Sequence, residues 1–167
     1  MMQLNKPFRT ITLSIIGAFI LAIMPLPDWI IEFRPDWVAL VLIYWIIAVP
    51  DKIGLTAAWF AGLFLDVSYG TLMGQHAIGM VLIAYVIQLQ QQRLRVASLL
   101  QQAIVIFFLL LLKQLLTLWV DGMLGRAPES WLYFMPTITS TLLWPWTYLI
   151  LKDIQGKFSV SKPYQYR

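Results

Sequence analysis

Three titratable side chains, Asp66, His76 and Lys113, stand inside otherwise apolar stretches of the chain. A carboxylate and an ammonium group at the same depth in a membrane can pair, and pairing removes a cost of at least about 2.5–3.5 kcal/mol for an isolated charge. Asp66 and Lys113 each lie about seven residues, or roughly 10 Å, from the expected outer end of their segment. The sequence therefore allows an intramembrane Asp66–Lys113 pair.

Two other interpretations of these charges stay open. Lys113 can extend outward to the interface while Asp66 is protonated or bonded to groups at a helix end. A proton or ion pathway is the third interpretation, but no further Asp, Glu or His lies at similar depth.

The remaining chemistry-bearing residues predict neither a catalytic centre nor a cofactor. His76 has no Asp, Glu or Cys at ligand spacing, so it is expected to form hydrogen bonds at the interface rather than hold a metal. The chain has no cysteine, which excludes thiol catalysis and thiolate metal sites. Neither a nucleophile–His–acid arrangement nor a Gly-rich nucleotide motif is present. A protein without enzymatic activity is predicted.

Small residues recur every fourth position around Asp66. On one helix they would form a stripe that lets another helix approach closely, with the carboxylate facing protein rather than lipid. The approaching helix is expected to belong to this chain, although a helix of a partner protein is the alternative. The stripe consists of Ala58, Gly62, Asp66, Gly70 and Gly74.

A charged turn precedes the second apolar segment. Pro35 is expected at the first position of a helix, with Asp36 directly after it near the positive end of the helix dipole. Arg34 lies between Glu32 and Asp36. Arg34 is therefore expected either to form a local salt-bridge cluster or to contact a partner outside the membrane, and the sequence favours neither.

Composition indicates a membrane protein with several spans. The chain is 60% hydrophobic and 12% charged, with a mean hydropathy of +0.74, against about 45–50% and about 25% in soluble domains. We expect one membrane domain over residues 1–167, an all-α bundle of six transmembrane helices. Segments 36–49 and 76–89 are shorter than the roughly 20 residues of a full span, so four spans with two re-entrant segments are the alternative. The six segments are 11–27, 36–49, 53–73, 76–89, 98–120 and 131–151.

The distribution of basic residues predicts the orientation. With six spans and both termini in the cytoplasm, the outer loops carry only Arg34 and Arg126, and Lys113 is intramembrane. The rest of the 12 Lys and Arg residues then lie inside: Lys6, Arg9, Lys52, Arg93, Arg95, Lys152, Lys157, Lys162 and Arg167.

Several motifs together resemble the MreD family of bacterial rod shape-determining membrane proteins, most closely its proteobacterial branch. Their order and spacing cover about residues 8–158. The motifs are Pro25-Leu26-Pro27-Asp28, Phe33-Arg34-Pro35-Asp36-Trp37-Val38, Gly62-Leu63-Phe64-Leu65-Asp66-Val67 followed by Gly70 and Gly74, and Leu143-Trp144-Pro145-Trp146.

The resemblance implies a multi-pass protein of the bacterial inner membrane. Its implied role is that of a non-enzymatic scaffold in the machinery that builds lateral peptidoglycan. The implied partners are MreC, the MreB filament, the RodA polymerase and a penicillin-binding transpeptidase, besides the lipid bilayer and without nucleic acid.

The resemblance also implies a fold similar to the substrate-binding subunits of ECF vitamin transporters. A substrate-binding subunit of a vitamin-uptake system is therefore the alternative function. An enzyme acting on acyl chains or lipids is a more distant alternative.

Overall fold

The structure is a computed structural model that describes residues 5–126, 128 and 130–158, and the regular secondary structure within them is helical throughout. Each of the six apolar segments expected from the sequence overlaps one of the longer helices, although several helices extend beyond the expected bounds. The elements are α1 (Asn5–Ile23), α2 (Asp28–Ile31), α3 (Trp37–Ala48), α4 (Leu55–Tyr69), α5 (Gln75–Val96), α6 (Leu99–Met123), the 3₁₀ helix η1 (Trp131–Phe134) and α7 (Met135–Phe158).

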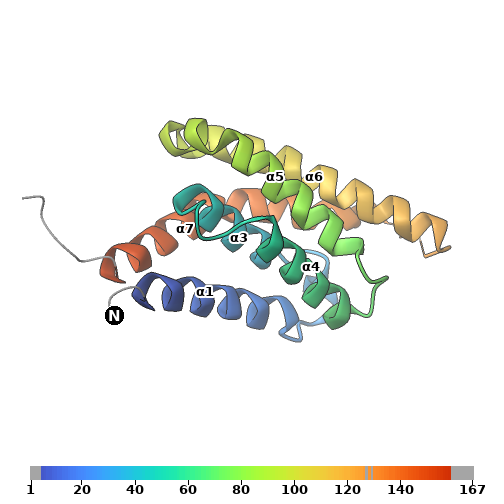
Figure 1. Cartoon of the computed structure of the whole chain (residues 1–167). Coiled ribbons are helices and arrows are strands. Elements are labelled where there is room, and N and C mark those ends of the chain that lie inside the picture. Colours follow the sequence, from blue (N-terminus) through green and yellow to red (C-terminus); the bar gives the residue numbers. More distant parts are fainter. Residues whose placement is uncertain (1–4, 127, 129, 159–167) are drawn as a thin grey trace, which may run out of the picture.

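Helix α3 forms the core of the bundle. Its residues 38–47 are all buried, and it packs against α1, α5 and α7 (Figure 1). A helix that is apolar on every face is typical of a buried core helix or of a membrane span, and the burial of α3 shows the first. Asp36 caps the start of α3, and the helix ends at Ala48, just before Pro50.

The helices define two ends of the bundle. At one end α1, α4 and α6 finish and α3, α5 and α7 begin. At the other end lie the start of α1 and the end of α7, so both ends of the described chain are on the same side (Figure 1). We call the first of these the cavity end and the second the terminal end.

Six full membrane spans are not confirmed by the helix lengths. Among the described residues, α6 is the one helix both long and apolar enough to cross a membrane, with a mean hydropathy of 2.4 in its most apolar window. The apolar helices Phe8–Ile23, Trp37–Ala48 and Leu55–Tyr69 are shorter. The 12 residues of α3 extend only about 18 Å, against about 30 Å for a bilayer core.

The expectation that one helical stripe runs from Ala58 to Gly74 is wrong at its outer end. Helix α4 finishes at Tyr69, and Gly70 caps it with a φ of 64°. Gly74 precedes α5 with a φ of 100°. Both backbones lie in the left-handed region, which glycine adopts without the steric cost of a Cβ atom. These two glycines end and start helices instead of lining one.

Gly62 is the member of the stripe at which two helices touch. A Cβ atom built on Gly62 would lie 2.3 Å from the Cα atom of Ala77 in α5. The backbones of α4 and α5 are therefore in contact here, as small residues at helix interfaces permit. The helix that approaches Gly62 belongs to this chain.

Trp144 and Pro145 lie in the middle of α7. Trp144 is fully buried, and its indole N–H donates to Gln102 Oε1 at 3.1 Å, which joins α7 to α6. Pro145 has no N–H, so α7 lacks one backbone hydrogen bond to the carbonyl four residues earlier.

We expect Gly62→Ala to lower the stability of the bundle. The new methyl group would force α4 and α5 apart, and overpacking of this kind costs about 1–3 kcal/mol. Thermal unfolding in detergent would measure the loss. Gly17→Ala in α1 is the matched control, because a Cβ atom there meets nothing within 4 Å. Equal melting temperatures for the two variants would contradict the close approach.

Candidate functional site

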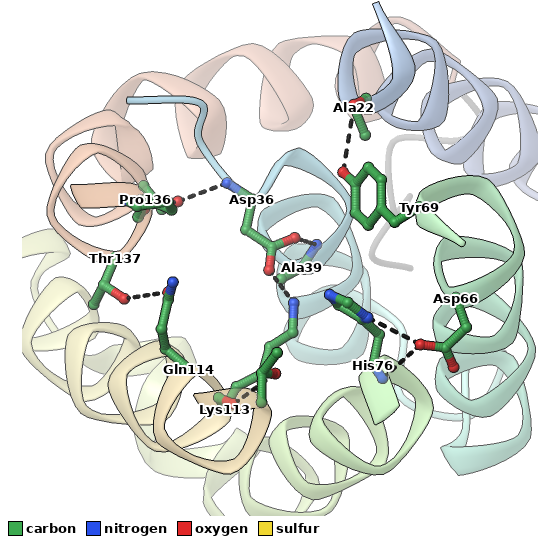
Figure 2. A network of polar contacts seen from close by, with 12 residues as sticks. Ala22, Asp36, Ala39, Asp66, Tyr69, His76, Lys113, Gln114, Pro136 and Thr137 are labelled. Atoms are coloured by element: carbon green, nitrogen blue, oxygen red, sulfur yellow. Dashed lines mark hydrogen bonds and ion pairs between the residues drawn. The ribbon is translucent and has the colours of Figure 1, made fainter. Parts of the chain in front are cut away.

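A polar cavity of about 400 Å³ opens at the cavity end of the bundle. Its walls come from the turn before α3, the end of α4, the start of α5, the last turns of α6 and the start of α7. Figure 2 shows polar side chains from these elements pointing toward a common centre. The charged and polar side chains of the wall include Arg34, Asp36, His76, Lys113 and Gln114.

Asp36 connects three helices at the centre of this site. Its carboxylate forms an ion pair with Lys113 Nζ of α6 and accepts a hydrogen bond from the Ala39 amide at 3.1 Å, so it also caps α3. Its own amide donates to Ser140 Oγ of α7 at 2.8 Å. Asp36 is thus the N-cap residue of α3, and Trp37 is its first helical residue. The expectation that Pro35 occupies the first helical position is therefore wrong by two residues.

Lys113 reaches Asp36 by crossing the backbone of α5. A Cβ atom at Gly79 would lie 2.6 Å from Lys113 Cγ, so the lysine stem occupies the space that a side chain would fill. The sequence analysis did not single out Gly79. The signal available in the sequence was a glycine in one apolar segment and a lysine in the next.

Asp66 closes the turn between α4 and α5. Its carboxylate accepts hydrogen bonds from the amides of Gly74 and His76, both at 2.8 Å, and from Thr71 Oγ1 at 3.1 Å. His76 Nδ1 lies 2.9 Å from Asp66 Oδ1. Asp66 is fully buried, and every one of these partners belongs to the segment that follows α4.

The Asp66–Lys113 pair allowed by the sequence is not formed in the described part of the chain. Lys113 pairs with Asp36, and Asp66 is bonded to groups at the start of α5. The second interpretation is therefore correct for Asp66. The physical reason is that the Gly79 crossing directs Lys113 toward the start of α3, while backbone amides already satisfy Asp66.

Arg34 caps the end of α1. Its two terminal nitrogens donate to the carbonyl oxygens of Ala22 and Met24. The Tyr69 hydroxyl donates to the same Ala22 carbonyl (Figure 2). Within the described residues Arg34 forms no ion pair with Glu32 or Asp36, so the interpretation as a local salt-bridge cluster is wrong. Its Nε is buried and makes no hydrogen bond there. Contact with a partner stays a prediction.

Several polar residues of the wall were missed by the sequence analysis. Gln114 donates to the Tyr133 carbonyl and accepts from Thr137 Oγ1 at 3.0 Å. Gln75 Nε2 donates to Asp121 Oδ1 at 2.8 Å. The available signal was the spacing of Lys113, Thr117 and Asp121, which recur every four residues in the second half of an apolar segment.

This arrangement suits recognition of a partner or ligand better than catalysis. The carboxylates of the buried Asp66 and the half-buried Asp36 are each held by fixed partners. Among the residues that the structure describes, no group of three His, Asp or Glu side chains could hold a metal ion. A recess with convergent polar groups and a volume in the range of about 300–1,000 Å³ is typical of binding sites.

Comparisons with known proteins give a consistent result. The family model described as rod shape-determining protein MreD matches residues 2–154. A curated relative named "Rod shape-determining protein MreD", from Haemophilus influenzae, is 31% identical over 148 residues, which are 89% of this chain and 91% of the relative. No solved structure matches. Both matches carry the family name that the sequence motifs predict.

We expect the Asp36 and Lys113 charges to be energetically coupled. Asp36→Asn or Lys113→Gln alone leaves the other charge buried without its partner, whereas the double variant leaves none. A double-mutant cycle on thermal unfolding should give a coupling of about 1 kcal/mol or more. Asn still caps helices well, so the cap of α3 is kept. The matched control is the Asp66→Asn/Lys113→Gln cycle, in which the two losses of stability should be additive. Coupling between Asp66 and Lys113 without coupling between Asp36 and Lys113 would contradict the observed pairing.

Asp66→Asn should loosen the turn between α4 and α5. Asn offers one acceptor oxygen in place of two, so an amide of Gly74 or His76 loses a charge-assisted hydrogen bond of about 1.5–3 kcal/mol. Hydrogen exchange of residues 70–76 should become about tenfold faster or more. Asp51→Asn, exposed at the opposite end, should leave this exchange unchanged. Unchanged exchange in the Asp66 variant would show that the carboxylate does not hold the turn.

Proposed function

We propose that this chain, which belongs to the MreD family of rod shape-determining proteins, is a non-catalytic membrane scaffold of the machinery that elongates rod-shaped bacteria. Its proposed task is to bind MreC at the polar cavity and so to help organise lateral peptidoglycan synthesis. The observation that carries the proposal is the cavity itself, whose charged walls are held rigidly by internal partners.

A location in the bacterial inner membrane is supported by the surface of the bundle. The chain is 60% hydrophobic, α6 is apolar over the length of a span, and large apolar side chains are exposed on α1, α4, α5, α6 and α7. The bias of Lys and Arg toward the terminal end supports cytoplasmic termini. The cavity end then faces the periplasm.

The cavity is the surface best suited to a partner on that side. Its wall contains the Arg34–Asp36 turn, for which the sequence predicts a contact with a partner outside the membrane. A polar segment of MreC next to the membrane is the proposed occupant. MreB, RodA and a penicillin-binding transpeptidase are the further proposed members of the same complex.

A second candidate is the substrate-binding subunit of an ECF-type vitamin transporter. The volume of about 400 Å³ is large enough for a small polar ligand. The two candidates differ in what accompanies the purified protein: a membrane protein partner in one case, a retained small molecule in the other.

Thr117→Trp should reduce retention of MreC when the two proteins are co-expressed and purified in detergent. The indole would fill the cavity, because Thr117 is part of its wall, and the residue's hydroxyl bonds only within its own helix. Leu115→Trp is the matched control, since Leu115 belongs to the same helix but is exposed outside the cavity. We expect at least about a tenfold loss of MreC for the first variant, in line with hot-spot residues, and no loss for the second.

Mass spectrometry of the same preparations separates the alternatives. If Thr117→Trp retains MreC fully, MreC does not bind in the cavity. If the unsubstituted chain retains a small polar molecule that Thr117→Trp releases, and MreC is absent, the transporter function replaces the scaffold function.

A further inference from the structure

The apolar stripe that α6 exposes is taller than the apolar part of α1 or of α4. Helix α6 exposes one continuous apolar stripe along its whole length, and the stripe is about 34 Å tall at the helical rise per residue. That height matches or exceeds the core of a bilayer. The stripe consists of Leu100, Ile104, Phe108, Leu112, Leu115, Trp119 and Met123.

The side formed by α1 and α4 is shorter. Helix α4 has 15 residues, about 22 Å, and the apolar part of α1, Phe8–Ile23, is about 24 Å long. Figure 1 shows these two helices on the side of the bundle away from α6. The difference in apolar height between the two sides is therefore about 10 Å.

The two ends of α4 differ from its apolar middle. Asp51 and Lys52 are exposed just before the helix, and Gly70 ends it at the other side. The last carbonyls of a helix lie outside its own hydrogen-bond ladder and need water or another donor. The end of α4 cannot sink into hydrocarbon without leaving those carbonyls unpaired, so the bilayer has to adjust to the helix.

An apolar hollow lies along α1 on this short side, next to Phe64 of α4. Its volume is about 740 Å³, and its wall includes Ile16, Phe19 and Ile20 of α1 and Phe64 of α4. The Phe19 and Phe64 rings meet edge to face, with centroids 4.7 Å apart. Apart from Thr12 the lining residues are apolar, so acyl chains are the occupants that suit it.

We propose that the bilayer is thinner beside α1 and α4 than beside α6, and that short-chain phospholipids gather at the α1–α4 side and fill its hollow. The inference rests on the proposed membrane location. A difference between the apolar height of the protein and the hydrocarbon thickness of the bilayer costs a fraction of a kcal/mol for each ångström. This cost is enough to select lipids by chain length. The protein would thus settle where bilayer thickness changes, with its short side toward the thinner region.

Lipid selection can be measured at two matched positions. The chain contains no cysteine, so Phe60→Cys in α4 and Phe108→Cys in α6 each give a single labelling site, and the native side chains are 69% and 62% exposed. The full-length variants, labelled with a fluorophore, would be placed in vesicles of equal di-14:1 and di-22:1 phosphatidylcholine. In each measurement one of the two lipids carries brominated acyl chains. The bromine quenches the label in proportion to the local amount of that lipid.

We expect the short lipid to be enriched about twofold or more at position 60 relative to position 108. Equal quenching ratios at the two positions would overturn the proposal while leaving the membrane location intact. If neither lipid quenches the label at position 108, α6 does not lie in hydrocarbon, and the proposed membrane function fails together with the inference.

Discussion

The fold depends on satisfying the backbone at helix ends that stop inside the bundle. A short helix such as α3 has several amides and carbonyls without intrahelical partners at each end, and hydrocarbon offers none. Polar and charged side chains supply the missing partners at nearly every such end. The contacts are Arg34 to the end of α1, Asp36 to the start of α3, Arg95 to the Ile47 and Ala48 carbonyls, Asp66 to the start of α5, and Gln102 to the Leu94 and Ala97 carbonyls.

The same side chains shape the candidate site. Because Asp36 and Asp66 bind the backbone amides at helix starts, their carboxylates are fixed in position. Lys113 is held against the Asp36 carboxylate, and Arg34 is held against the Ala22 carbonyl. These contacts fix the positions of the cavity walls. Structural capping and a preorganised polar recess are thus two results of one arrangement, and preorganisation lowers the cost of binding.

Sequence patterns predicted the helices and the family but not the partners of the charges. Apolar run lengths located each long helix, and the small side chain of Gly62 predicted the contact with a neighbouring helix. Periodicity cannot distinguish a glycine on a helix face from one that ends a helix, so Gly70 and Gly74 were misplaced. Similar depth in the expected spans pairs Lys113 with Asp66, whereas the sequence pattern places Asp36 in the turn at the membrane surface. The Gly79 crossing that directs the lysine is a tertiary feature without a local pattern.

The Asp36–Lys113 pair has a consequence for biosynthesis. The two residues are 77 positions apart, so at about 5–20 residues per second the ribosome needs about 4–15 s to deliver the lysine after the aspartate. During that interval α4 and α5 are made, but Asp36 has no ionic partner, and α7 follows only after α6. A chain that stops before α6 therefore leaves the Asp36 carboxylate without Lys113, which is a feature that quality-control proteases can recognise.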